Sequence, residues 1–219
     1  MVVLNWQEID TVLLDMDGTL LDLHFDNYFW RQHLPLSYAR LHGVTVTEAA
    51  AKVAELSARH QGSLQWYCLD FWQQALDMDI VALKREVQHL IAVHNGVEVF
   101  LQALRRTGKK IVLVTNSHQD SLALKMRCTE LTAYFDLMIT SHQLGLAKEQ
   151  VGFWEQLQSI APFQAERTVL FDDSLAVLRN AQAYGIRHLR SIHQPDSQSP
   201  VQDVTGFHAI TGFAEVMPV

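Results

Sequence analysis

Two carboxylates directly follow an apolar run in Val12-Leu13-Leu14-Asp15-Met16-Asp17-Gly18-Thr19-Leu20, near the start of the chain. The apolar run is typical of a strand covered on both faces, and Gly18 lets the chain turn sharply beyond it. Open α/β sheets bind ligands at the carboxyl ends of their strands. Asp15 and Asp17 would share one face of a straight strand, although Gly18 is expected to bend the path. The pattern therefore predicts a reaction centre at a sheet edge.

Two carboxylates so close together repel each other unless a cation or a shared proton compensates. A divalent metal is the expected compensation, because Mg²⁺ prefers carboxylate and carbonyl oxygens. The alternative interpretation is an exposed Asp-x-Asp-Gly turn after an ordinary strand. The residues that follow the other predicted strands distinguish a metal-binding reaction centre from an exposed turn.

The chain has 219 residues, of which 48% are hydrophobic, enough for one large domain or for a core with a small insert. A formal charge of −7 argues against polymeric nucleic acid and anionic membranes as partners. Cys68 and Cys128 have no metal-ligand spacing and are interpreted as free buried thiols in a reducing compartment. Residues 1–8 lack a targeting pattern and no apolar run approaches a membrane span, which favours a cytoplasmic protein.

The pattern changes along the chain and predicts two parts: a core of residues 1–20 and 94–219, and a helical insert of residues 21–93. Helical spacing in the insert covers residues 25–41, interrupted at Pro35, then 44–59 with Thr45 or Thr47 as cap, 64–72 and 80–93. These segments suffice for a small helical bundle.

From Gly96 onward, strands and helices alternate, which is the pattern of a parallel sheet wound with helices. The predicted strands are 110–115, 137–140, 168–171 and 188–191, and the predicted helices are 98–107, 121–131, 149–160 and 175–184. The tail beyond them is weakly patterned.

Residues able to do chemistry follow each apolar strand run. They are Asp15 and Asp17, then Thr115-Asn116-Ser117, then Lys148 beyond Gly145, then Asp172-Asp173. Parallel strands would bring most of them to one edge. Acids, a hydroxyl and a lysine at one place suit phosphoryl transfer, which depends on positioning and charge neutralisation. Taken singly, the residues also fit ordinary roles: Thr115 capping a turn, Lys148 in solvent, and an aspartate or Ser174 capping the next helix.

With these four motifs the chain resembles the haloacid dehalogenase-like superfamily from about residue 11 to 191, with the insert placed like a helical cap after the first motif. The resemblance implies a three-layer Rossmann-like α/β core and a magnesium-dependent phosphohydrolase. More narrowly, residues 14–23, 25–30 and 66–70 resemble bacterial 5′-nucleotidases that act on GMP and IMP.

The resemblance implies a role for each motif residue. Asp15 would be the nucleophile that forms an aspartyl-phosphate, and Asp17 would be the acid and base, with a pKa raised by its acidic neighbours. Mg²⁺, with Mn²⁺ or Co²⁺ as substitutes, would be held by Asp15, the carbonyl of Asp17, and Asp172 or Asp173. Thr115, Asn116 and Lys148 would bind the phosphoryl oxygens. Asp17 favours phosphate esters over carbon–halogen bonds, because dehalogenating members lack this second acid.

Two positions depart from the family pattern. Glu149 follows Lys148 where proline is common, and would either place an extra acid near the lysine or start the next helix. Val177 stands where a second acid is often found, so the metal ligand in the fourth motif is left open between Asp172 and Asp173.

The insert would supply substrate contacts, since a cap adds specificity to a shared phosphate site. The candidates are Asp26, Asn27, Tyr28, Trp66, Tyr67 and Asp70, and the alternative for each is core packing. His24 and His118 lie near motifs but are left out of the catalytic set. The expected partner is a small phosphorylated metabolite, foremost a purine nucleotide, and the sequence defines no oligomeric state.

Four other functions remain open at this point. A sugar-phosphate phosphatase or a phosphomutase would use the same core motifs. A phosphoreceiver module is opposed by the order of the acids, and a catalytically inactive binding relative by the presence of every core group.

Overall fold

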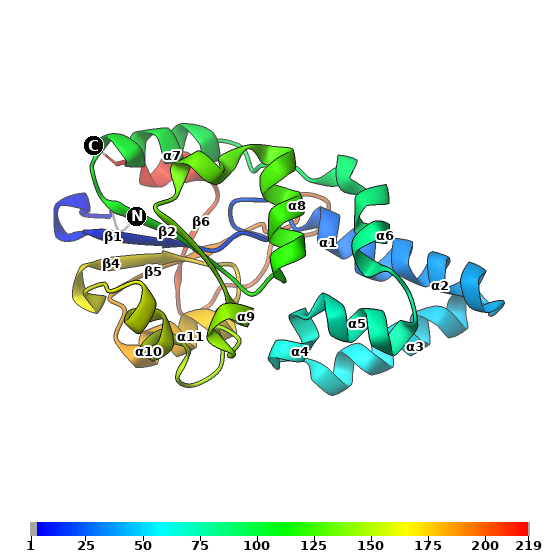
Figure 1. Cartoon of the computed structure of the whole chain (residues 1–219). Coiled ribbons are helices and arrows are strands. Elements are labelled where there is room, and N and C mark those ends of the chain that lie inside the picture. Colours follow the sequence, from blue (N-terminus) through cyan, green and yellow to red (C-terminus); the bar gives the residue numbers. More distant parts are fainter. Residues whose placement is uncertain (1–3, 219) are drawn as a thin grey trace.

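The computed structural model describes residues 4–218, and a six-stranded parallel sheet lies at its centre (Figure 1). The strand order is β3-β2-β1-β4-β5-β6. The strands are β1 (Thr11–Leu14), β2 (Lys110–Thr115), β3 (Leu137–Thr140), β4 (Thr168–Phe171), β5 (His188–Ile192) and β6 (His208–Ile210). The predicted strands 110–115, 137–140 and 168–171 are therefore confirmed.

β1 is a central strand with a parallel neighbour on each side. Leu14 at its end is in register with Leu113 of β2 and Phe171 of β4. The backbone N–H of Asp15 still donates to the carbonyl of Phe171, at 3.0 Å. The residues that follow these strands therefore emerge at one edge of the sheet.

Helices cover both faces of the sheet and make the core three-layered (Figure 1). Helices α7 (Val97–Arg106) and α8 (Gln119–Thr129) lie on one face, and α10 (Phe153–Ile160) and α11 (Leu175–Tyr184) lie on the other. Side chains alternate between the two apolar layers, with Leu13 in one and Val12 and Leu14 in the other. The predicted α/β fold class is confirmed.

A group of helices between β1 and α7 extends to one side of the sheet (Figure 1). They are α1 (His24–Tyr28), a π-helical turn (Phe29–His33), α2 (Leu34–His42), α3 (Val46–His60), α4 (Leu64–Tyr67), α5 (Leu69–Leu76) and α6 (Ile80–Glu86). This helical segment has its own apolar cluster around Phe25, Phe29 and Trp72. It leaves and rejoins the core at an antiparallel bridge between Leu21 and Val93.

Short elements complete the described chain. They are α9 (Ser141–Leu144) and the 3-10 turns Trp6–Glu8, Gln88–Leu90, Leu131–Tyr134, Ala165–Arg167 and Phe213–Val216. Within residues 4–218, no helix combines the length and the apolar character needed to cross a membrane.

Several predicted helix boundaries are wrong. The helix expected from Glu149 begins at Phe153, because Gly152 has a left-handed φ of 92° and ends the preceding turn. The helix expected over 64–72 is broken at Cys68, which has an extended backbone, and the one expected over 80–93 ends at Glu86. The interruption expected at Pro35 is present, since a π-helical turn, Phe29–His33, separates α1 from α2 and Pro35 lies in the first turn of α2.

Two other expectations need correction. The tail contains the short strand β6, which the sequence pattern did not predict. Both cysteines are free thiols as expected, but they are not buried: Cys68 is half-buried and Cys128 is exposed.

Candidate active site

A cavity of about 730 Å³ lies at the carboxyl edge of the sheet, between the core and the helical segment. Its core wall contains every predicted motif residue: Asp15, Asp17, Thr115, Asn116, Lys148, Asp172 and Asp173. Its other wall includes Asp26, Asn27, Trp30, Trp66, Tyr67, Trp72 and Lys84 from the helical segment. The expectation that separate strand ends share one site is met.

Lys148 is a buried cation between two buried aspartates. Its ammonium group donates to the carboxylate of Asp15 and, at 2.6 Å, to that of Asp172. Its side chain is only 3% exposed, so the solvated interpretation of this lysine is wrong. Burial acts against its charge, but the two carboxylates outweigh burial and raise the pKa of Lys148. The lysine is therefore charged and positioned beside Asp15.

Three acids, Asp15, Asp172 and Asp173, lie close together. The single positive charge of Lys148 does not balance their negative charge. Each offers a carboxylate oxygen within 4.8 Å of the others. Burial, opposed by Lys148 and assisted by Asp172, raises the pKa of Asp15 to about 6. Burial and the two neighbouring carboxylates raise the pKa of Asp173 well above its ordinary value. A hard divalent cation such as Mg²⁺ fits this donor set and its excess negative charge.

Gly18 makes the approach of Asp173 to the first motif possible. Its φ is 80°, and a Cβ there would lie 2.7 Å from a carboxylate oxygen of Asp173. A larger residue would be strained and would displace the acid. Ser174, as expected, caps α11 by accepting the N–H of Val177, so the capping role is separate from the two acids.

Asp17 has different partners from Asp15. One of its carboxylate oxygens accepts from the Ser117 hydroxyl at 2.6 Å, and the other accepts from the ammonium of Lys125 at 2.5 Å. Burial is the main cause that raises the pKa of Asp17; Lys125 opposes it, and the nearby acids add to it. The two aspartates of the first motif are thus chemically distinct.

Lys125 also connects Asp17 to the helical segment. The same ammonium donates to Asp26 of α1 at 2.6 Å, and Asp26 accepts from Lys84 of α6 at 2.7 Å. Both lysines are at most 2% exposed. Burial alone would raise the pKa of Asp26, but the two ammonium groups lower it to about 2. Asp17, Lys125, Asp26 and Lys84 form a buried row of alternating charges, called here the charge row.

The second motif has structural contacts as well as access to the cavity. Thr115 accepts the N–H of Ser117, which is the turn-capping role considered for it and leaves its own hydroxyl proton for a ligand. The Asn116 side chain accepts the N–H of Lys148 at 2.8 Å and donates to Glu149 at 2.9 Å. Glu149 therefore orients the second motif and does not begin a helix.

Glu149 also reaches the helical segment. Its other carboxylate oxygen accepts from the hydroxyl of Tyr67 at 2.9 Å. Burial, together with the charge of Glu149, raises the pKa of Tyr67. The hydroxyl thus stays protonated and links the two walls of the cavity.

The predicted contacts in the helical segment have mixed outcomes. Asn27, Trp66 and Tyr67 line the cavity, while Asp26 lines it but is bonded to two lysines. Tyr28 and Asp70 are not among its lining residues. Tyr28 packs beside the apolar cluster of the helical segment, and Asp70 is exposed near His118.

Lys84, Lys125 and Ser117 were missed as site residues. A signal exists for Lys84, because it lies four residues after Ile80 and three before Val87, on the buried side of its helix. A lysine on an apolar stripe requires a buried partner. Lys125 carries a weaker signal of the same kind, since it lies four residues after buried Ser121 and three after buried Leu122 in α8.

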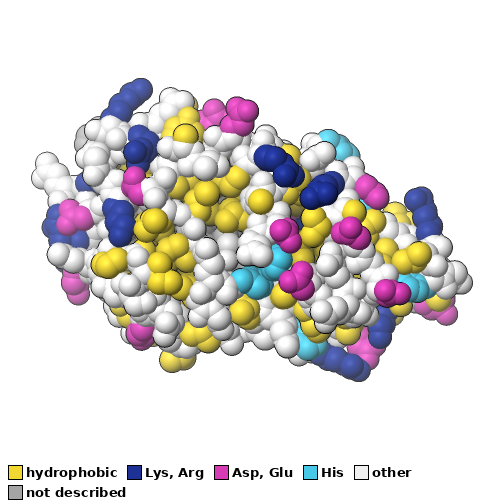
Figure 2. Space-filling view, in the orientation of Figure 1, with side chains coloured by type: hydrophobic (Ala, Val, Ile, Leu, Met, Phe, Trp, Pro, Cys, Tyr) yellow, Lys and Arg dark blue, Asp and Glu magenta, His cyan; other side chains and the backbone are white. Residues whose placement is uncertain are grey.

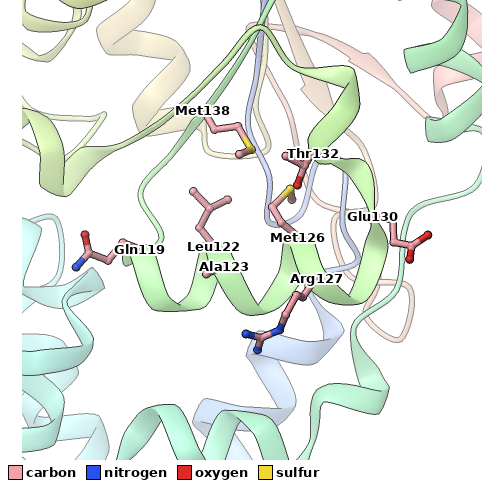
Figure 3. A pocket seen from close by; sticks show the side chains of 8 residues that line it. All are labelled: Gln119, Leu122, Ala123, Met126, Arg127, Glu130, Thr132 and Met138. Carbon is pink, nitrogen blue, oxygen red and sulfur yellow. The ribbon is translucent and has the colours of Figure 1, made fainter.

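A second hollow, of about 550 Å³, lies between α8 and Met138 of β3 (Figure 3). Leu122, Met126 and Met138 form its apolar floor, and Arg127 and Glu130 lie at its margin. Glu130 is the one acid among its lining residues, so it has no group of acids, and the chemistry is assigned to the cavity at the carboxyl edge of the sheet.

Comparison with known proteins agrees with this geometry. Residues 9–185 match the family model described as haloacid dehalogenase-like hydrolase. The chain is 42% identical over 192 residues to the GMP/IMP nucleotidase YrfG of Escherichia coli, covering 88% of this chain and 86% of the relative. It is 22% identical to a phosphorylated carbohydrates phosphatase of Thermotoga maritima, covering 84% of this chain and 85% of the relative.

A solved structure has the same fold over nearly the whole chain. The HAD phosphatase of Thermococcus onnurineus aligns with a TM-score of 0.77 and 23% identity, covering 94% of this chain and 95% of the other. The protein belongs to the haloacid dehalogenase-like hydrolase family. It is an enzyme of the phosphoric monoester hydrolase class, as the sequence predicted.

Proposed function

We propose that this enzyme is a Mg²⁺-dependent 5′-nucleotidase that hydrolyses purine nucleoside monophosphates, with GMP and IMP foremost, through a phosphorylated Asp15. The observation that carries the proposal is the pairing of Asp15 with buried Lys148 at the foot of a cavity whose other wall is rich in tryptophan. The name of the 42% identical relative supports the same substrates.

In the first step, a carboxylate oxygen of Asp15 attacks phosphorus and the bond to the ribose 5′ oxygen breaks. Asp17 gives its proton to that leaving oxygen, and its raised pKa keeps the proton available. Lys148 and Thr115 stabilise the phosphoryl oxygens by charge and hydrogen bonding.

In the second step, ionised Asp17 takes a proton from water. The water oxygen attacks the phosphoryl group, which releases inorganic phosphate and restores Asp15. Asp15, Asp172, Asp173 and the Asp17 carbonyl would hold Mg²⁺, which would neutralise phosphate charge when bound.

We further propose that residues 21–93 act as a cap that supplies base specificity, and that residues 1–20 and 94–219 supply the chemistry. The helical segment packs around an apolar cluster of its own residues together with Leu124 of α8, and the chain enters and leaves it side by side at Leu21 and Val93. Trp30 and Trp66 lie in the cavity wall, and aromatic faces stack favourably on purines.

Phosphate release from a substrate panel tests the proposal. We expect GMP and IMP to be hydrolysed faster than AMP, flavin mononucleotide, ribose 5-phosphate or glucose 6-phosphate. We also expect chelation of Mg²⁺ to abolish the activity and added Mg²⁺ to restore it. Hydrolysis of sugar phosphates alone would refute the purine assignment, and phosphoryl transfer within a sugar would indicate a phosphomutase.

Trp66→Leu separates recognition of the base from recognition of the phosphate. Stacking is worth about 1–3 kcal/mol per base, so KM for GMP should rise about tenfold. KM for ribose 5-phosphate, which has no base, should not change. An equal rise for both substrates would show that Trp66 acts on the phosphate site or on folding.

Lys125→Met tests the charge row. An opposite charge close to a carboxylate lowers its pKa by about 1–3 units, so removing Lys125 should raise the pKa of Asp17 further. The alkaline limb of the kcat/KM profile, where Asp17 loses its proton, should move to higher pH, and kcat should fall. The measurement is the pH dependence of GMP hydrolysis.

The matched control is Lys52→Met, which removes an exposed lysine of α3. It should leave the profile unchanged. If Lys125→Met lowers activity without moving the alkaline limb, Lys125 does not act through the protonation of Asp17.

A further inference from the structure

A cysteine and two histidines converge at the margin of the candidate active-site cavity, where His118 is one of the lining residues. Cys68, His118 and His142 each offer a ligand atom within 4.8 Å of the others. Cys68 lies between α4 and α5 in the helical segment, whereas His118 caps α8 and His142 lies in α9 of the core. Figure 2 shows histidine and acidic side chains gathered on this face, where the helical segment meets the sheet layers.

His142 has ligand atoms without any partner. Both of its ring nitrogens are shielded from solvent and make no hydrogen bond within residues 4–218. Buried polar atoms are normally paired, so two unpaired nitrogens on one ring require an explanation.

The surroundings of His118 resemble those of a ligating histidine. Its ring lies edge-on to that of His142, with centroids 4.9 Å apart. Asp120 lies 3.5 Å from Nδ1 and also donates its backbone N–H to that atom at 3.4 Å, while Asp70 lies 3.6 Å from Nε2. A metal bound at Nε2 requires the ring proton on Nδ1, where the Asp120 carboxylate can accept it in place of the 3.4 Å contact from the backbone N–H. Asp70 lies on the Nε2 side and offers a carboxylate oxygen close to His118.

We propose that Cys68, His118 and His142 form a binding site for a thiophilic divalent transition metal of the Zn²⁺ class. A thiolate and two imidazoles select such a metal over Mg²⁺, which prefers oxygen. On binding, the ion replaces the thiol proton of Cys68, and the proton passes to solvent. The site is separate from the acids Asp15, Asp172 and Asp173.

The ion would fasten the helical segment to the core. Its ligand Cys68 directly follows Tyr67, whose hydroxyl already contacts Glu149 across the cavity. Coordination would therefore hold the two walls together at the cavity mouth. Product release requires the two walls of the cavity to separate, so the bound ion would slow turnover. Zn²⁺ would then inhibit the enzyme without contacting Asp15, Asp172 or Asp173.

The test uses the full chain with excess Mg²⁺ present, so that the oxygen site is occupied. Titration with Co²⁺ should give one equivalent of binding with a thiolate-to-metal absorption band in the near ultraviolet. Isothermal titration with Zn²⁺ should give the same stoichiometry. Cys68→Ser and His142→Asn should each weaken binding about tenfold or more. Loss of a residue that merely hydrogen-bonds to a metal ligand already costs about 10- to 100-fold in metal affinity, so loss of a ligand should cost at least as much.

Cys128 provides the matched control, because it is the exposed cysteine of the chain. Cys128→Ser should bind as the native protein does. Zn²⁺ should protect Cys68 but not Cys128 from alkylation, as read by peptide mass. It should also slow GMP hydrolysis in the native chain but not in Cys68→Ser.

Equal Zn²⁺ affinity in Cys68→Ser and the native chain, or Co²⁺ binding without the thiolate band, would overturn the proposal. Failure to bind one equivalent in the presence of Mg²⁺ would overturn it as well. None of these binding outcomes depends on which phosphate ester the enzyme hydrolyses.

Discussion

Asp15→Asn should abolish phosphate release from GMP. The amide is nearly isosteric with the carboxylate but cannot act as a nucleophile toward phosphorus. Removing the covalent nucleophile of a hydrolase costs about 10⁴- to 10⁶-fold in kcat. The measurement is phosphate release in Mg²⁺ with a large excess of enzyme, so that a loss of this size can be followed.

At pH 8, with a chelator present, Asp15→Asn should be at least as stable as the native chain. Folding raises the pKa of Asp15 from 3.8 to about 6, so the folded state holds a proton that the unfolded chain releases. Stability from this group is therefore present below about pH 4 and is lost as pH rises through about 6. At pH 8 the buried charge is unfavourable, and an asparagine removes it. The thermal midpoint should stay equal or rise.

Asp10→Asn is the matched control, because Asp10 lies at the opposite end of β1, exposed and paired with Arg167. It should keep native activity. Equal phosphate release by the native chain and Asp15→Asn would show that the nucleophile is a different group.

Asp17→Asn should lower kcat for GMP by about 10²- to 10⁴-fold, the usual contribution of a positioned acid or base. The effect should depend on the leaving group. Ribose oxygen needs a proton as it departs, whereas nitrophenolate does not. With p-nitrophenyl phosphate, the first step should therefore survive in the variant and the second step should fail, since no base remains to activate water.

A burst experiment distinguishes the two steps. Rapid mixing of Asp17→Asn with p-nitrophenyl phosphate should release one nitrophenolate per chain and then nearly stop. The mass of the intact protein should increase by one phosphoryl group. Steady turnover at the native rate, or no burst, would contradict the assignment of both proton transfers to Asp17.

Much of the core could be predicted because its signals are local. The runs Lys110–Thr115, Leu137–Thr140 and Thr168–Phe171 are apolar and are bounded by polar residues, and each forms the strand expected. β6 could not be predicted, because its three residues have too little apolar pattern and depend on pairing with β5. The start of α10 depends on the left-handed backbone of Gly152.

The candidate site also contains residues that could be predicted from the sequence and residues that could not. Asp15, Asp17 and Lys148 follow strand ends, so parallel topology alone brings them together. The pattern around Lys84 indicates that this lysine is buried, but the pairing within the charge row could not be predicted, because the carboxylates that bind Lys84 and Lys125 are far away in sequence. Burial of a lysine is favourable only where such partners are in place, and their place is a property of the packed structure.

The bridge between Leu21 and Val93 bears on how the enzyme could change over evolutionary time. The polypeptide departs from the sheet and returns to it at adjacent positions, so more than seventy residues are attached as a long loop would be. Insertions, deletions or exchanges within that excursion need not shift any catalytic strand. On the proposed division of roles, substrate choice could change in this way while the catalytic strands stay in place, provided that Asp26 keeps its contact with Lys125.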